Sequence, residues 1–305
     1  MRMILIGLLL ILITPVTSAE FSRTYIDQHP LQVANVNGVD IGYRLIGESD
    51  KPKVVIIMGL GASNVVSGDN LVRGIEQAGY QLVLFDNRDT GASTRFDDWG
   101  QPLVWWQLLK LKLGLGVSAP YTLGDMSADT VALMDWLNIE DAHIIGFSMG
   151  GMIAQKMAVH HPERTKSLTL VMTTTGAKHL PPPTEEAAKL LANLASGEAT
   201  QERATAFRER GFYTESMPRQ MMAIFKDGDR SEAVRTIMND TLVVHGQDDI
   251  LIPPAHGVYT AEIIENSELV IFPGMGHNVP DLVLPEFLTR VIGHFSVAEM
   301  ASGSR

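Results

Sequence analysis

The spacing of hydrophobic positions along this chain predicts strands that alternate with helices. Short continuous apolar runs, typical of strands that a parallel sheet buries on both faces, occur in the segments KPKVVIIMG, YQLVLFD, AHIIGF, SLTLVM, TLVVHG and ELVIF. Between these runs, apolar residues recur at helical spacing near residues 71–78, 125–138, 149–161, 254–265 and 285–295. Because elements that alternate at this interval form right-handed βαβ units, we expect an α/β fold around a parallel sheet.

Two stretches depart from the alternation. Apolar and polar residues alternate within residues 20–50 around a turn at Asn37-Gly38, which predicts an antiparallel hairpin of edge strands. Residues 177–238 begin with a proline-rich turn and continue with helical spacing and no strand pattern, so we expect an inserted helical cap there. The predicted core therefore comprises residues 20–176 and 239–297.

The N-terminus has the pattern of a secretory signal. A short cationic start, Met1-Arg2-Met3, precedes an apolar run of 13 residues from Ile4 to Val16, and small residues follow at Thr17-Ser18-Ala19. We therefore expect residues 1–19 to be a leader and the protein to be exported to the periplasm or secreted. The alternative is an uncleaved segment that tethers the protein to the membrane, although the run is shorter than the ~20 residues of a spanning helix.

Charge and composition narrow the class of partner. The formal net charge of −11 disfavours binding to nucleic acid or to an anionic lipid surface unless other features assist it. The chain has no cysteine, which excludes a disulfide framework, a thiolate nucleophile and a thiolate metal site. The expected partner is a small molecule, and we expect no stable membrane insertion beyond the N-terminal leader, because no other segment has 18 consecutive apolar residues.

A candidate nucleophile lies in Gly146-Phe147-Ser148-Met149-Gly150, directly between a predicted strand and a predicted helix. In this G-x-S-x-G context the serine occupies a strained turn, and both glycines are needed where the backbone approaches closely. The free N–H groups of the helix N-terminus favour a negative oxygen, so the Met149 N–H is a predicted oxyanion donor. The alternative is a glycine-serine turn that only joins the two elements.

Histidine and aspartate candidates follow the last two predicted strands. His277 lies in the loop PGMGHNVP, where a base can reach a nucleophile at the same edge of the sheet, whereas the other eight histidines lack such a position. Asp248 and Asp249 both follow the strand TLVVHG. We favour Asp249 as the acid that orients His277, because of its spacing from a turn glycine and from the next helix, and Asp248 remains an alternative.

Three other segments bear on the site. The glycines around Leu60, after the first buried strand, allow the Leu60 N–H to serve as the second oxyanion donor. Asp86 and Asp89 could be imagined as metal ligands, but Arg88 between them would repel a cation, so we expect a hydrogen-bonded turn and no metal site. The apolar run that begins at Trp105-Trp106 is compatible with a substrate pocket or with core packing.

These motifs resemble those of the α/β-hydrolase superfamily over roughly residues 30–297. The order Ser148, Asp249, His277 is the order of these enzymes and not that of chymotrypsin or subtilisin. The segments LVLFDNRDTGAS, YTLGDMSADTVALMDWL, AHIIGFSMGGMIAQ and LTLVMTTTG are similar to the aclacinomycin methylesterase-like polyketide esterases. The resemblance implies an eight-stranded, mostly parallel sheet, a helical cap, no cofactor and hydrolysis of carboxylic esters.

The sequence thus predicts an exported serine hydrolase that cleaves a small-molecule ester with the triad Ser148, Asp249 and His277. Two alternatives stay open. A cofactor-free perhydrolase or acyltransferase would use the same triad with another acceptor, and a non-catalytic protein of the same fold would only bind its ligand.

Overall fold

All the predicted strands belong to a single sheet. The computed structural model describes residues 23–195 and 201–303, so the predicted leader at residues 1–19 lies outside the described residues. The sheet has eight strands in the order β1-β2-β4-β3-β5-β6-β7-β8. The strands are β1 (Gln32–Val36), β2 (Val39–Ile46), β3 (Lys53–Ile57), β4 (Gln81–Phe85), β5 (Ala142–Phe147), β6 (Thr165–Val171), β7 (Thr241–Gly246) and β8 (Ser267–Phe272).

The six strands from β3 to β8 pair in parallel, as their buried apolar runs predict. The hairpin predicted at Asn37-Gly38 is confirmed, since β1 and β2 pair antiparallel around these residues. The prediction that both strands of the hairpin lie at the edge of the sheet is correct for only one of them. β1 lies at the edge of the sheet, but β2 also pairs antiparallel with β4 and is therefore an interior strand. The alternating pattern of β2 identified a strand but could not show that both of its edges are paired.

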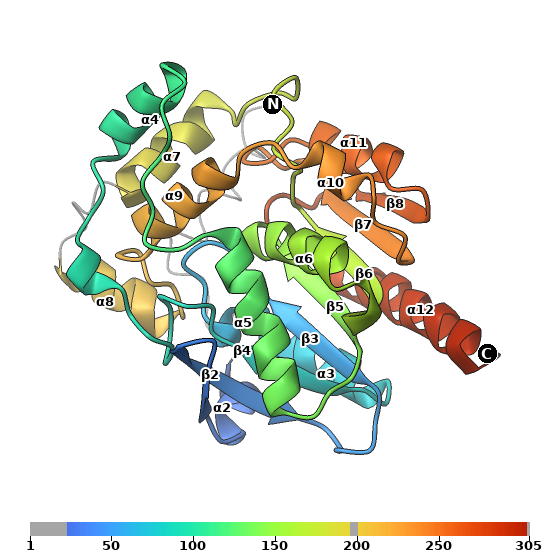
Figure 1. Cartoon of the computed structure of the whole chain (residues 1–305). Helices are drawn as coiled ribbons and strands as arrows, with labels where there is room; N and C mark the ends of the chain where they lie inside the picture. The colour runs from blue at the N-terminus through green and yellow to red at the C-terminus, as the bar shows by residue number, and fades with distance from the viewer. Residues whose placement is uncertain (1–22, 196–200, 304–305) are drawn as a thin grey trace.

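Helices cover both faces of the sheet (Figure 1). The described helices are α2 (Thr24–Gln28), α3 (Asp69–Gln77), α4 (Val104–Lys112), α5 (Leu123–Trp136), α6 (Met149–His160), α7 (Glu185–Ala195), α8 (Gln201–Glu209), α9 (Met217–Asp227), α10 (Ser231–Val234), α11 (Ala255–Ile263) and α12 (Leu284–Gly303), with 3-10 turns η1 (Asn64–Ser67), η2 (Asp97–Trp99) and η3 (Pro162–Arg164). The final helix was expected to end at Phe295, but α12 continues to Gly303.

Alternate residues of the buried strands pack into two separate cores. In β3, Val55 and Ile57 belong to a core shared with α5 and α6, whereas Val54 and Ile56 belong to a core shared with α3 and α12. This alternation follows from the two-residue period of a strand, which places successive side chains on opposite faces. The sheet is thereby held rigidly between two helical layers, and its carboxyl ends form a fixed platform.

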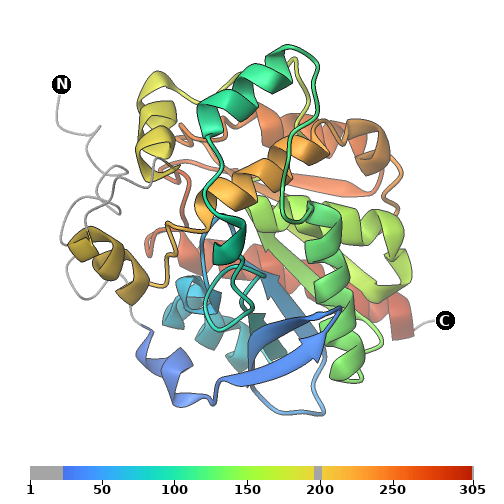
Figure 2. The same cartoon turned by 60° about the vertical axis from the view of Figure 1, so that its left-hand side comes forward.

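Between β6 and β7 the described residues form helices α7 to α10. Figures 1 and 2 show α7, α8 and α9, together with α4 from an earlier part of the chain, gathered at one end of the molecule away from the C-terminus. Within the described residues, none of the helices combines the length and the apolar character that crossing a bilayer requires.

Candidate active site

Ser148 occupies a sharp turn between β5 and α6. Its backbone has φ 54° and ψ −116°, a left-handed conformation that is costly for a residue with a side chain. The flanking glycines are required by space, because a Cβ on Gly146 would lie 2.5 Å from Gly150 O, and a Cβ on Gly150 would lie 2.0 Å from Ile57 O in β3. Thr173 supports the turn by donating its hydroxyl to Ser148 O at 2.7 Å. The strained turn lifts the serine out of the sheet.

His277 and Asp249 meet Ser148 from two loops at the carboxyl ends of β8 and β7. The Ser148 hydroxyl donates to His277 Nε2 over 2.9 Å, and His277 Nδ1 donates to Asp249 Oδ2 over 2.7 Å. Ser148 and Asp249 lie 101 residues apart in the chain. The parallel strands bring them to one edge of the sheet. Asp248 points elsewhere, since it is exposed and accepts from Gly274 N.

The Asp249 carboxylate is buried and surrounded by donors. Oδ1 accepts from the backbone N–H groups of Leu251 and Ile252, both at 2.9 Å. Burial by itself would raise the pKa of Asp249, but hydrogen bonds from His245 and His277 and from the Ile252 N–H outweigh it and hold this pKa well below the ordinary value. Asp249 is therefore an anion at neutral pH, able to fix the His277 tautomer and to stabilise a protonated imidazole.

His245 is a second histidine on this carboxylate, which sequence reasoning treated as a strand residue. It is fully buried, its Nε2 donates to Ile252 O at 2.7 Å, and the same nitrogen lies 3.5 Å from Asp249 Oδ2. Gly257 makes room for its ring, because a Cβ there would lie 2.6 Å from His245 Nδ1. The position of His245 four residues before Asp249 was the only available indication in the sequence.

The two predicted oxyanion donors flank Ser148. Met149 is the first residue of α6, where backbone N–H groups have no acceptor within the helix. The loop that contains Leu60 passes against the nucleophile, since a Cβ on Gly59 would lie 3.2 Å from both Ser148 Cβ and Phe147 O. The N–H groups of Leu60 and Met149 thus belong to backbone segments that meet at Ser148.

The turn after β4 is hydrogen-bonded to the loop that contains Leu60. Asn87 Nδ2 donates to Met58 O at 2.9 Å, and the Asp86 carboxylate accepts from the Asn64 backbone N–H and side chain at 2.7 Å each and from Ala92 N at 2.8 Å. The hydrogen-bonded turn expected from the sequence is present. Among the described residues no group of three or more histidine or acidic side chains is arranged to hold a metal ion.

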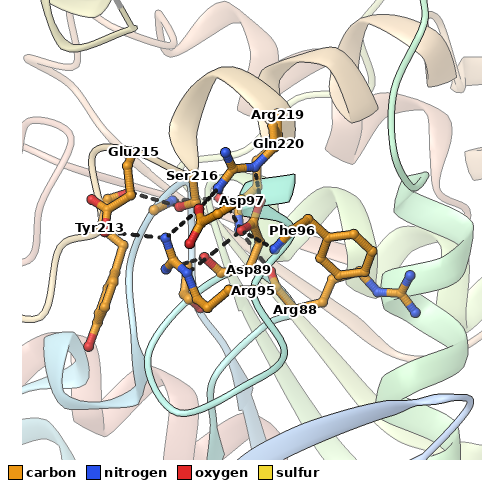
Figure 3. A network of polar contacts seen from close by, with 12 residues as sticks. Arg88, Asp89, Arg95, Phe96, Asp97, Tyr213, Glu215, Ser216, Arg219 and Gln220 are labelled. Carbon is orange, nitrogen blue, oxygen red and sulfur yellow. Dashed lines mark hydrogen bonds and ion pairs between the residues drawn. The ribbon is translucent and has the colours of Figure 1, made fainter. Parts of the chain in front are cut away.

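Helix α9 reaches the same turn from above (Figure 3). Arg219 is fully buried and donates twice to the Asp89 carboxylate, at 2.6 and 2.8 Å. Its neighbour Gln220 donates to Arg88 O at 3.2 Å and accepts from Gly61 N at 2.7 Å. The helix inserted after β6 is thus bonded both to the turn after β4 and to the loop that carries Leu60.

The sequence analysis predicted neither the ion pair of Arg219 with Asp89 nor the hydrogen bonds of Gln220. Asp89 and Arg219 are 130 residues apart, and no local pattern connects them. One indirect indication existed, because Asp89 lies in a turn dense in polar residues, and a buried carboxylate requires a cationic or hydrogen-bonding partner. Asp89 has φ 74°, which an aspartate tolerates better than most residues.

The fold and the contacts among Ser148, His277 and Asp249 are those expected of a hydrolase. Residues 52–221, more than half of the chain, match the family model described as alpha/beta hydrolase fold. The chain belongs to this family, which confirms the expected fold and class of enzyme.

Individual relatives share this fold at low identity. The chain is 30% identical to 2-hydroxymuconate semialdehyde hydrolase from Pseudomonas sp. (strain CF600), over 66% of this chain and 81% of the relative. It is 22% identical to the rhodomycin D methylesterase DnrP from Streptomyces peucetius, over 83% and 94%, which agrees with the resemblance to polyketide esterases. Among solved structures, the enol-lactonase from Burkholderia xenovorans LB400 superimposes with a TM-score of 0.64 at 20% identity, covering 87% of this chain and 100% of that one.

Proposed function

We propose that this hydrolase cleaves carboxylic ester bonds of a small molecule through an acyl-enzyme formed on Ser148. The observation that supports the proposal is the continuous hydrogen-bonded series from Ser148 Oγ through the His277 ring to the buried Asp249 carboxylate, at 2.9 and 2.7 Å. A serine hydroxyl is a weak nucleophile unless an adjacent base removes its proton. His277 Nε2 is in position to do so.

The proposed reaction has two steps. His277 accepts the Ser148 proton as Oγ attacks the ester carbonyl, and the resulting oxyanion is held by the N–H groups of Leu60 and Met149. The protonated His277 then gives its proton to the departing alcohol. Water, deprotonated by the same imidazole, attacks the acyl-enzyme, and the imidazolium returns this proton to Ser148 Oγ as the bond to the acyl group breaks and the acid leaves. Since serine, histidine and water supply every group that reacts, the proposed chemistry needs no cofactor.

The test is hydrolysis of p-nitrophenyl esters of increasing acyl length by the wild type and by Ser148→Ala. We expect the substitution to remove most of the turnover, of order 10⁶-fold in comparable triads. Ser296→Ala is the matched control, because Ser296 is exposed on α12, where its hydroxyl bonds a backbone carbonyl of that helix and the Tyr80 side chain and none of the residues around Ser148. Turnover by Ser148→Ala at the level of the control would exclude Ser148 as the nucleophile.

A perhydrolase or acyltransferase would share the first step and differ in the acceptor. Product analysis in the presence of hydrogen peroxide or an alcohol separates them from a hydrolase. Free acid as the main product supports hydrolysis. A peracid or a new ester as the main product would instead assign the transfer reaction.

We also propose that the enzyme acts outside the cytoplasm. The support is the N-terminal pattern of a cationic start, an apolar run from Ile4 to Val16 and small residues up to Ala19. Fractionation of the producing cell, with mass spectrometry of the mature N-terminus, tests this proposal. Recovery of the intact chain, still beginning at Met1, in the cytoplasmic fraction would contradict it.

A further inference from the structure

The outer surface of α4 and the loop after it carries the densest group of exposed apolar side chains in the described part of the chain. Six leucines and two tryptophans between Leu103 and Leu115 are exposed, and they account for eight of the seventeen large apolar side chains exposed among these residues. Trp105 is 65% exposed and Leu113 is 64% exposed. Isolated exposed apolar residues are common, but a contiguous patch marks a surface that contacts something other than water.

α4 differs from an ordinary surface helix because none of its residues is buried and most of its apolar side chains are exposed. Gln107, its one uncharged polar residue, is partly buried, and its side-chain oxygen accepts from Ser118 N at 3.3 Å and from Lys110 Nζ at 3.4 Å. Trp105, Trp106 and the leucines face outward. A surface helix usually buries its apolar stripe and exposes its polar side. The exposed side of α4 is therefore suited to an apolar surrounding.

Within residues 23–195 and 201–303, no other element covers the exposed side of α4. The helix packs on α9, and Figures 1 and 2 both show it at the outer limit of the molecule, on the end opposite the C-terminus. With nine residues it is roughly 14 Å long, far too short to cross a bilayer. If this helix contacts a bilayer, it must therefore lie along the bilayer surface.

We propose that residues 103–116 dock the enzyme on a phospholipid bilayer, with the α4 tryptophans and leucines inserted among the lipids. Residues 103–118 include Lys110 and Lys112 but no acidic residue, in a chain whose net charge is −11. This local positive charge complements lipid phosphates, and charges farther away than about 8 Å are largely screened at physiological salt. Tryptophan, leucine and lysine together are typical of segments that bind at membrane interfaces.

A second copy of the chain fits this surface less well. A symmetric dimer formed through α4 would bring Lys110 and Lys112 of one copy close to the same residues of the other. Residues 103–118 offer no carboxylate to neutralise them. A bilayer offers both the apolar interior and the phosphate groups.

The test uses the full chain with Trp99→Phe and Trp136→Phe, so that only Trp105 and Trp106 report fluorescence. It is mixed with vesicles of phosphatidylcholine and phosphatidylglycerol whose acyl chains carry bromine, a quencher of tryptophan fluorescence. We expect the emission to shift to shorter wavelength and to be quenched. Unquenched emission while the protein floats with the vesicles would overturn the proposal, because binding would then occur through another part of the chain. Failure to float would overturn it as well.

A matched pair of double variants isolates the contribution of α4. In Trp105→Ser with Leu113→Ser, we expect vesicle affinity to fall about 100-fold, or roughly tenfold for each buried side chain. The control, Trp136→Ser with Leu282→Ser, removes a tryptophan and a leucine that are also exposed but lie outside residues 103–116, and it should keep wild-type affinity. Hydrolysis of a water-soluble ester should be unchanged in both, which separates docking from catalysis. Equal affinity of the two double variants, or loss of a concentration-dependent dimer in the α4 variant alone, would refute the proposal.

Discussion

His143 provides a quantitative test of how the C-terminal helix is attached to the sheet. Its ring lies fully buried at the start of β5, stacked on Phe295 of α12 with ring centroids 4.4 Å apart. Nδ1 is 2.8 Å from the Ser167 hydroxyl, which donates to it, and Nε2 donates to Glu299 Oε1 over 3.0 Å. Burial lowers the pKa of His143 from 6.5 to about 4, although Glu299 opposes the shift. The native protein therefore needs this imidazole to be neutral.

The direction and size of the effect on stability follow from the two pKa values. Because the folded pKa is the lower one, the unfolded state binds the proton more readily, and stability falls as the pH falls from about 6.5 toward about 4. At pH 7 almost none of this stability has been lost. At pH 5 about 2 kcal/mol of it is lost, and below pH 4 the loss approaches about 3 kcal/mol, since each pKa unit corresponds to about 1.4 kcal/mol.

The assay is urea unfolding at pH 7 and at pH 5, followed by tryptophan fluorescence and extrapolated linearly to water. Other groups also titrate in this interval, so the relevant quantity is the difference between the wild type and His143→Gln, which cannot gain the proton. We expect the variant to be less stable at pH 7 but to lose about 2 kcal/mol less than the wild type between the two pH values. His160→Gln, at an exposed position, should follow the wild type. Equal losses in wild type and His143→Gln would refute the reasoning.

Three further substitutions test the contacts that hold the site together. Arg219→Met should lower the free energy of unfolding by up to about 3–5 kcal/mol, because it removes the cation that donates twice to the buried Asp89 carboxylate and leaves Arg95, 3.9 Å away, as a weaker partner. Denaturation should show a much smaller loss in an Asp89→Asn background, and additive losses would contradict a direct pairing. His245→Phe should lower kcat about tenfold with little change in KM, because it removes the N–H that lies 3.5 Å from Asp249 Oδ2 and that holds Ile252 O beside this carboxylate. An unchanged kcat for a soluble ester would argue against this role. Gln220→Leu should likewise lower kcat by about tenfold, because the Gly61 N–H loses its acceptor. Gln220→Glu keeps an acceptor for this N–H and should retain more activity. Equal activities of the two variants would exclude that hydrogen bond as the cause.

Local patterns in the sequence predicted the parts of the fold that depend on local geometry. The glycines on either side of Ser148 predicted the turn, because only residues without a Cβ fit within 2.5 Å of the neighbouring backbone. The placement of Asp249 and His277 after late strands predicted their meeting, because parallel strands end at the same edge of the sheet. Both predictions used only strand order and turn chemistry.

Contacts between distant segments were beyond those patterns. Nothing near Arg219 in the sequence indicates Asp89, and nothing near Gln220 indicates the backbone N–H of Gly61. The end of α12 was misjudged for a related reason, since Glu299 is held in the helix by its contacts with His143 and Lys166, which precede it by more than 130 residues. Such pairings depend on tertiary packing, which overrides local propensity.

The exposure of α4 also could not be predicted from its apolar sequence. A pocket wall, a core helix and an exposed helix can share the same run of tryptophan and leucine, and only the burial of each side chain separates them. The sequence left a substrate pocket and core packing open for Trp105 and Trp106, and the structure, which places both side chains on the outside, excludes core packing.

Covalent labelling of Ser148 tests the central claim most directly. A fluorophosphonate reacts with a serine that a neighbouring imidazole activates and leaves a stable adduct on its oxygen. Digestion and mass spectrometry should find the adduct on the peptide that contains Ser148, with ester hydrolysis lost in proportion to labelling. His277→Ala should not be labelled, because its serine lacks the base. Complete labelling of another residue together with loss of activity, or an unlabelled Ser148 in a fully inactivated enzyme, would contradict the account.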